Sequence, residues 1–146
     1  MQLNTKPLSQ IELRSPVLAD GSYHAKIVKK EVRPNTAKTG NNLFLEFQVV
    51  DPILTKHDGS QVENSGNATY TRFISLVPTA KYAPDKVLKE LALALNLPSD
   101  KENFELEDIQ GYVIIKMKYR PAEGQYQECN DIAGFLPVED TFSPAL

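Results

Sequence analysis

The chain has 146 residues, of which 41% are hydrophobic and 24% are charged, and its formal net charge is −3. This length and composition fit one globular domain with a core of its own, and no apolar run approaches the roughly 18 residues of a membrane-spanning helix. A single cysteine, Cys129, excludes an intramolecular disulfide framework and indicates a reducing compartment such as the cytoplasm.

Residues 1–20 form the first predicted segment, an N-terminal arm. Pro7 and Pro16 interrupt it, and its apolar residues keep no period, so we expect no regular element there. Such an arm could pack along the domain or mediate contacts with other molecules. The turn signal Asp20-Gly21 then opens the predicted domain.

Two strands are predicted on either side of a short basic turn at residues 34–41. In the first strand, apolar and polar residues alternate over residues 23–27 and the alternation slips at Val28, which predicts a β-bulge. In the second strand, residues 43–49 place an apolar side chain at every other position. Phe44 falls between these positions, so we expect this aromatic side chain to point outward.

The next stretch, residues 51–67, is long and polar, and it is predicted to be a flexible loop with room for a small extra hairpin. Residues 68–77 form the third predicted strand, although the period alone does not decide which of its faces is buried. A helix is predicted over residues 84–96, because Pro84 suits the first helical position and an apolar stripe follows at helical spacing.

Two further strands are predicted at residues 112–120 and 125–135, joined by a hairpin-type connection at residues 121–124. Strand, strand, strand, helix, strand, strand is the element order of an OB-fold, a five-stranded Greek-key barrel that often binds oligonucleotides. We therefore predict a mainly β protein with an OB-fold domain over residues 21–137, one α-helix between strands three and four, and a short tail over residues 138–146.

The sequence carries no recognisable catalytic or metal-binding motif. A phosphate-binding glycine-rich loop, a CxxC pair and an HExxH motif are all missing. His24 and His57 have no second ligand at metal spacing, so we expect structural or solvated roles for them, and a half-buried strand position for Cys129. The expectation is a protein that is not an enzyme and needs neither a metal nor a cofactor.

Positive charge is concentrated in two segments. Residues 22–40 carry five basic side chains against a single acid, Glu31, and residues 112–120 carry three basic side chains and no acid. Segregation of this kind can produce one positive face on an acidic protein, although lysines also occupy the solvent side of ordinary strands.

Single-stranded nucleic acid is bound by basic grooves that follow the phosphates and by aromatic side chains on which bases stack. In an OB-fold, the face of strands two and three and the loops joining strands one–two and four–five bind the ligand. For Tyr70 and Tyr126, as for Phe73, a place in the core is the alternative. The candidate binding residues are Lys26, Lys29, Lys30, Arg33, Lys38, Phe44, Tyr70, Arg72, Lys116, Lys118, Tyr119, Arg120 and Tyr126.

Several segments share the pattern of one family. They are the strand start at residues 21–25, the Lys-x-Gly turn and strand at residues 36–51, and residues 106–113 and 130–135. Over about residues 20–137, the chain resembles phage-type OB-fold single-stranded DNA-binding proteins. The resemblance implies an accessory protein of DNA replication or recombination that coats single strands without a cofactor, with Lys38, Phe44 and Arg72 at binding positions.

The expected partners follow from the same resemblance. We expect single-stranded DNA as the ligand, a homo-oligomer, no membrane contact, and a place in the host cell cytoplasm if the protein is viral. Proteins of this type often recruit replication partners through an acidic C-terminal tail, and here the tail carries Glu139 and Asp140.

Two other function classes stay open. A structural or assembly protein of a virus-like particle, with a β-barrel or sandwich and an extended arm, fits the same pattern, and so does an OB-type module that binds a protein or a small ligand. Steep salt dependence of DNA binding would separate the first hypothesis from both of these. Arm-dependent oligomerisation without DNA affinity would favour the assembly protein.

Overall fold

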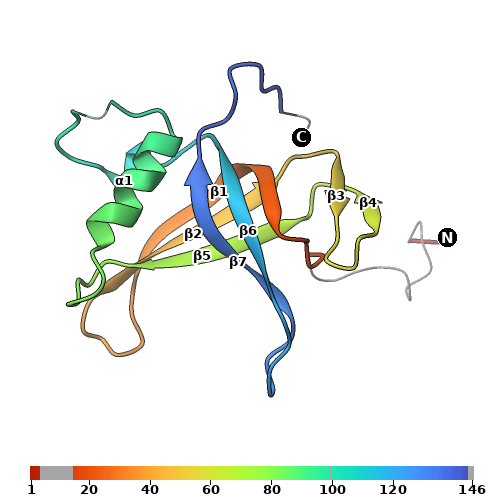
Figure 1. Ribbon diagram of the computed structural model, residues 1–146, viewed down its shortest axis with the longest axis horizontal. Coiled ribbons are helices and arrows are strands. Elements are labelled where there is room, and N and C mark those ends of the chain that lie inside the picture. The colour runs from red at the N-terminus through yellow and green to blue at the C-terminus, as the bar shows by residue number, and fades with distance from the viewer. Residues whose placement is uncertain (4–14, 99, 145–146) are drawn as a thin grey trace.

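The computed structural model describes residues 1–3, 15–98 and 100–144, and its main element is a five-stranded antiparallel sheet (Figure 1). The strands lie in the order β5-β2-β1-β6-β7, with each neighbouring pair antiparallel. Their bounds are β1 Gly21–Pro34, β2 Asn41–Val49, β5 Thr69–Ser75, β6 Tyr112–Arg120 and β7 Cys129–Leu136. The prediction of a mainly β protein with one α-helix is confirmed.

A separate two-stranded hairpin, β3 (Ile53–Thr55) and β4 (Gln61–Glu63), occupies the stretch that was predicted to be a loop. Its turn is set locally, because the Asp58 carboxylate accepts a hydrogen bond from the backbone N–H of Ser60 at 2.9 Å and Gly59 adopts a φ of 90°. The helix therefore lies between β5 and β6. The predicted position of the helix, between the third and fourth strands of the chain, is wrong. Because β3 and β4 precede it, the helix lies between the fifth and sixth strands.

The long first strand carries the β-bulge that the sequence predicts. The pairing of β1 with β2 shifts register between Ile27 and Lys29, which leaves Val28 unpaired and exposed. A second irregularity interrupts the β6–β7 pairing between Lys116 and Met117. Bulges bend strands and increase their twist, and in this sheet the two edge strands, β5 and β7, come within 8 Å of each other.

No hydrogen-bonded ladder joins β5 to β7 among the described residues, so the sheet is curved without being a closed barrel. Apolar side chains on its inner face form one core with Phe47 and Phe135 near the centre, at 5.6 Å between ring centroids. The alternation of β2 explains the placement, because Leu43, Leu45 and Phe47 all point inward from the same strand.

The helix α1 (Pro84–Ala94) packs against β5 and β7, where the sheet edges approach each other (Figure 1). Its buried side chains include Leu91, and Glu90 Oε1 accepts a hydrogen bond from the backbone N–H of Phe135 at 2.9 Å. This bond satisfies a donor at the free edge of β7.

Asn96, with a φ of 60°, follows the helix end in the left-handed conformation that asparagine tolerates. Further along the chain, η2 (Leu106–Asp108) is a single 3₁₀ turn.

The described end of the predicted arm, residues 15–20, packs on the domain, whereas residues 4–14 lie outside the described residues. Leu18 is fully buried in the core. Its backbone N–H donates to Asn130 Oδ1 at 2.7 Å, and Asn130 Nδ2 donates to the Leu18 carbonyl at 2.9 Å. One side chain of β7 thus ties this segment to the sheet.

Replacing Asn130 with alanine should lower the free energy of unfolding by about 1–3 kcal/mol, because a buried backbone donor and acceptor at Leu18 both lose their partner. Urea unfolding followed by circular dichroism measures the change. Asn103→Ala, at an exposed loop position, is the matched control and should stay within roughly 0.5 kcal/mol of the parent. Equal stabilities for the two variants would contradict the proposed tie.

Candidate nucleic-acid interface

The most suggestive surface is the outer face of β1, β2 and β5, which we call the aromatic face and define by Lys29, Glu31, Arg33, Phe44 and Phe73. In the sheet register, Glu31 is opposite Phe44, and Phe44 is opposite Phe73. Directly opposed residues on antiparallel strands have neighbouring side chains. The three strands therefore bring two aromatic rings and two cations together on one side of the sheet.

Phe44 lies on the outer face, as predicted, but it is covered and only 8% exposed. The guanidinium carbon of Arg33 lies 4.0 Å from the ring centroid and Lys29 Nζ lies 5.9 Å from it. The Phe73 ring packs against the Phe44 ring, at 5.0 Å between centroids. These cation–π and aromatic contacts cover the Phe44 ring, so Phe44 packs against Arg33, Lys29 and Phe73 and is not itself open to a ligand.

Phe73 is the exposed ring of the pair, at 55% of its surface. It was not among the predicted site residues, because the period of its strand leaves the buried face undecided. The structure resolves this ambiguity: Tyr70 and Ile74 are buried, which turns Thr71 and Phe73 outward. The neighbouring strand carried a signal for Phe73. If Phe44 points outward from β2, an aromatic residue on a strand that pairs with β2 can pack against it on the same face.

An acid within the aromatic face reduces its positive charge. Glu31 Oε2 lies 2.6 Å from Arg33 Nε, and Glu31 Oε1 lies 3.6 Å from Lys29 Nζ. The hydrogen bond from Arg33, with the nearby charges of Arg33 and Lys29, lowers the pKa of the Glu31 carboxyl below its ordinary value. The face thus presents the Arg33 guanidinium over the Phe44 ring, with a modest net positive charge.

Lys38 extends the positive charge into the β1–β2 turn. The turn is held by Asn35, whose backbone carbonyl accepts from the Lys38 N–H at 3.1 Å and whose side-chain oxygen accepts from the Thr39 N–H at 3.0 Å. Lys38 is exposed with a φ of 57°. The turn directly follows the end of β1 that carries Arg33, so Lys38 lies beyond the same end of the aromatic face.

The β6–β7 hairpin carries a second group of predicted residues. Arg120 Nη2 lies 2.7 Å from Asp131 Oδ2, and Lys118 Nζ lies 3.9 Å from Asp20 Oδ2. Tyr126 is 72% exposed in the connecting loop. The strand was predicted to begin at Gln125, but β7 begins at Cys129, so Tyr126 lies outside it. The hairpin therefore offers one open aromatic ring with cations that already have carboxylate partners.

Tyr119 of the same hairpin has a structural partner. Its ring stacks on His57 at 4.1 Å between centroids, and its hydroxyl donates to Glu128 Oε2 at 2.9 Å. That hydrogen bond is the main reason why the pKa of the Tyr119 phenol is raised. His57 Nε2 also lies 3.3 Å from Glu128 Oε2, so these contacts connect the β3–β4 hairpin to the β6–β7 hairpin.

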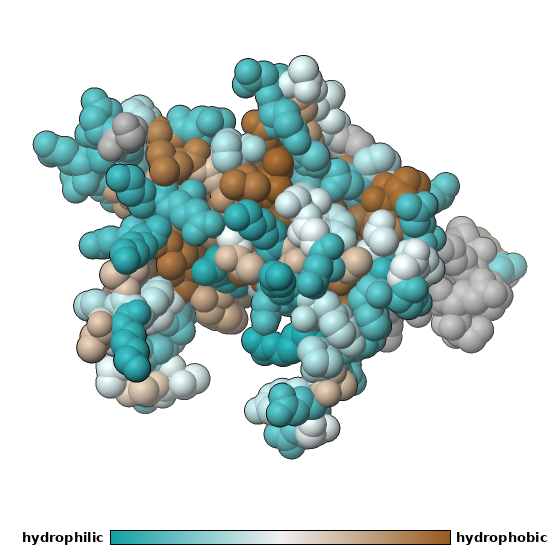
Figure 2. All heavy atoms as spheres, viewed as in Figure 1, coloured by the Kyte–Doolittle hydropathy of each residue, from teal (hydrophilic) through white to brown (hydrophobic). Residues whose placement is uncertain are grey.

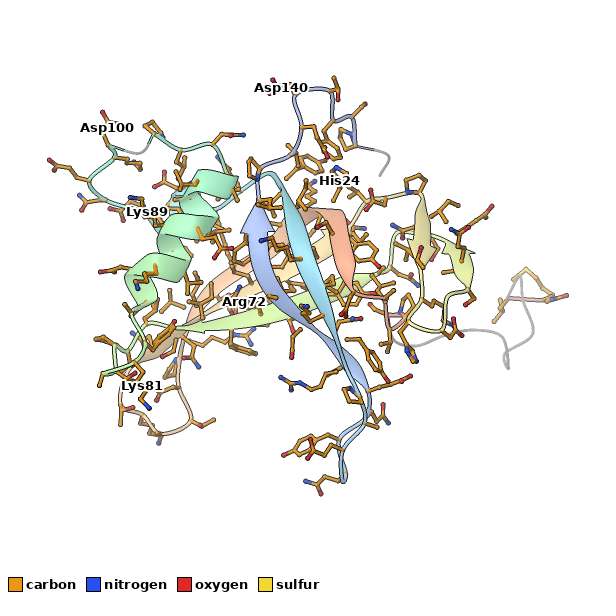
Figure 3. All side chains as sticks on the ribbon, in the orientation of Figure 1. His24, Arg72, Lys81, Lys89, Asp100 and Asp140 are labelled. Carbon is orange, nitrogen blue, oxygen red and sulfur yellow. The ribbon has the colours of Figure 1, made fainter. Side chains whose placement is uncertain are left out.

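Tyr70 and Arg72 lie away from the aromatic face. Tyr70 is in the core and donates from its hydroxyl to the Pro16 carbonyl at 2.5 Å, and burial strongly raises the pKa of its phenol. Arg72 lies half-buried on β5 (Figure 3), and its guanidinium carbon is 5.1 Å from the centroid of the Phe135 ring. Burial lowers the pKa of the Arg72 guanidinium, and Glu90 partly opposes this effect.

Three lysines that were predicted to bind nucleic acid lie away from the aromatic face, because the pairing of β1 with β2 and β6 places them elsewhere on the sheet. The bulge at Val28 places Lys30 on the inner side of the sheet, where Nζ approaches the Glu107 carbonyl at 3.5 Å. Lys26 and Lys116 are exposed on the outer side, on the part of the sheet where β1 pairs with β6. The predicted residues thus fall into several groups.

The β1–β2 turn and the β6–β7 hairpin project toward the same side of the molecule (Figure 1). The space-filling view shows mainly hydrophilic side chains on both projections, whereas hydrophobic side chains gather nearer to α1 and the centre (Figure 2).

Other candidate sites are less developed. A hollow of about 480 Å³ lies between α1 and residues 97–98 and 101–105, with Leu88, Leu93 and Phe104 in its lining, and none of the predicted site residues line it. In the described part of the chain, no group of three or more His, Cys, Asp or Glu side chains is placed to hold a metal ion. Cys129 is half-buried at the start of β7, as predicted.

No helix in the described ranges is both long and apolar enough to cross a membrane. Neither a scan against protein-family models nor a search of curated proteins finds a match for this chain.

Proposed function

We propose that this protein is a non-enzymatic, sequence-tolerant single-stranded DNA-binding protein built on an OB-type barrel. The observation that carries the proposal is the aromatic face. There the exposed Phe73 ring packs against Phe44, and the guanidinium of Arg33 lies over the Phe44 ring. An open ring beside cations on a sheet surface is suited to stacking with a base while the adjacent phosphates are neutralised.

The strand order supports an OB-type barrel. The sheet places β1 in the centre, β2 and β5 on one side, and β6 and β7 on the other, and its edges approach each other where α1 packs. A five-stranded Greek-key barrel that is partly open has such an arrangement. Within that frame, the aromatic face and the two projecting hairpins correspond to the surfaces that usually bind oligonucleotides.

A role in phage DNA replication or recombination, and recruitment of replication proteins through the tail, follow from the family resemblance. The charges support an affinity that depends moderately on salt, since Lys29 and Arg33 of the aromatic face and Lys38 in the adjacent turn are the cations and Glu31 opposes them. Three phosphate contacts give a slope of about −2 in log K against log salt for a single strand.

Fluorescence anisotropy of labelled oligo-dT should show binding that weakens by roughly 10- to 20-fold between 50 and 200 mM salt, as expected for about three released counterions. A duplex of the same length should bind more weakly, because its bases are not available to stack on Phe73. Absence of binding to oligo-dT at 50 mM salt would contradict the proposal. Light scattering would then test the alternative of an assembly protein through particle size.

A further inference from the structure

The C-terminal tail folds back onto the outer face of β1, where it contacts His24 (Figure 3). Glu139 Oε2 lies 2.7 Å from His24 Nε2. Three residues later, the Phe142 ring stacks on the imidazole at 4.7 Å between centroids and an interplanar angle of 3°. Phe142 also packs against Tyr112 of β6, at 5.5 Å between ring centroids. The tail is thus held by one ion pair and two ring contacts.

The other side of His24 is bound to a fixed carboxylate. Asp51 Oδ1 lies 2.8 Å from His24 Nδ1, and Asp51 Oδ2 accepts from the backbone N–H of His24 at 2.9 Å. Asn64 Nδ2 donates to the Asp51 carbonyl at 2.8 Å, which anchors the backbone of that residue. Asp51 therefore belongs to the body of the domain, whereas Glu139 belongs to the tail.

Both ring nitrogens of His24 face carboxylate oxygens, and only the imidazolium has two N–H donors. A neutral ring can donate to just one of the two acids. Because Asp51 is fixed by its other hydrogen bonds, the proton of a neutral ring is best placed on Nδ1. Nε2 would then direct a lone pair at the Glu139 carboxylate, and the contact with the tail would become repulsive.

We propose that the surface formed by His24 and Tyr112 is a docking site for residues 138–142 of this same chain, and that it holds them only while His24 is protonated. The occupant is specified by the contacts: an acid at Glu139 for the imidazolium, and an aromatic ring at Phe142 for the His24 and Tyr112 rings. The inference does not depend on nucleic-acid binding.

The surrounding charges decide the pH range. Burial alone would lower the pKa of His24, but the hydrogen bonds and charges of Glu139 and Asp51 outweigh it and raise the pKa above its ordinary value of 6.5. The hydrogen bond to His24 is the main cause that lowers the pKa of Glu139. Lys26 on β1, Lys116 on β6 and Asp140 of the tail are other charged groups on these elements, and the charges that shift the pKa of His24 are those of Asp51 and Glu139.

Docking of the tail is therefore strongest at pH values between the lowered pKa of Glu139 and the raised pKa of His24. Because Glu139 of the docked tail raises the pKa of His24, the advantage of docking is complete below the pKa that His24 has when the tail is released. It is lost as the pH rises through the higher pKa of the docked state. On the acid side, the contact is lost as the pH falls through the lowered pKa of Glu139. Between the two pKa values of His24, in the released and docked states, the equilibrium constant for release should rise up to tenfold per pH unit.

The test is an NMR titration of the full chain from pH 5 to 9, following the His24 ring protons and the Phe142 amide. We expect both signals to shift with one shared midpoint above 6.5, and Phe142 to approach random-coil values at high pH. His24→Gln and Glu139→Gln should each release Phe142 at pH 6. Retained dispersion of the core signals would show that these variants are folded.

His57 supplies the matched control, because it also pairs with a carboxylate and stacks on an aromatic ring, at a different place in the fold. His57→Gln should leave the titration of Phe142 unchanged. The proposal is overturned if the Phe142 signals stay constant from pH 5 to 9, if His57→Gln abolishes their change with pH, or if His24→Gln leaves Phe142 docked at pH 6.

Discussion

Replacing Phe135 with alanine is expected to lower the free energy of unfolding by about 3–5 kcal/mol. Phe135 is almost fully buried on β7, and its ring packs 5.6 Å from that of Phe47 on β2. The half-buried guanidinium of Arg72 lies 5.1 Å above the same ring. Truncation would leave a cavity between the two halves of the sheet and would remove the aromatic partner of a charge that burial already penalises.

Phe73→Ala is the matched control, since it removes the same side chain from the exposed aromatic face. Its cost should be about 1 kcal/mol or less, because the ring is more than half exposed. Urea unfolding monitored by far-ultraviolet circular dichroism compares both variants with the parent. A loss below about 1 kcal/mol for Phe135→Ala would mean that Phe135 is not central to the core.

The sequence predicts the local features of this fold well because they depend on local residue patterns. Pro84 and the stripe that includes Leu91 define α1, the alternation of residues 43–49 defines the inner face of β2, and the slip at Val28 defines the bulge. Each of these signals involves residues close in the chain. The main strands follow from them, whereas the short strands β3 and β4 and the start of β7 at Cys129 do not.

The composition of the candidate site depends on features that a local pattern does not contain. The bulge at Val28 moves Lys30 to the inner side and keeps Lys29 and Arg33 together on the outer side. The pairing of β2 with β5 then determines that Phe73, and not Tyr70, lies beside Phe44. Both outcomes require the register between strands, which tertiary packing sets.

The histidines illustrate the same limit. Structural or solvated roles were expected for both, but no pattern in the sequence indicates that His24 meets Glu139 from the opposite end of the chain. Likewise, the stacking of His57 on Tyr119 removes a predicted binding residue from the open surface. Contacts between distant segments thus decide which polar and aromatic side chains remain available to a ligand.

The largest expected effect on function is at Arg33. Arg33→Glu should weaken binding to oligo-dT by roughly 30- to 100-fold at 50 mM salt, because the variant would remove a proposed phosphate contact and would place a second acid, in addition to Glu31, beside the aromatic rings. The slope of log K against log salt should fall by about 0.7 for the lost contact. Lys89→Glu, the matched charge reversal at an exposed position on α1 (Figure 3), should have a much smaller effect.

Phe73→Ala tests the second component of the same face. Loss of stacking with one base should weaken binding by about 1–3 kcal/mol while leaving the salt slope unchanged, since no charge is altered. Anisotropy titrations of both variants at several salt concentrations separate the two components. If Lys89→Glu weakens binding as much as Arg33→Glu, attraction to the overall charge explains the binding. If Phe73→Ala binds like the parent, bases do not stack on this ring, and the aromatic face is not the binding site.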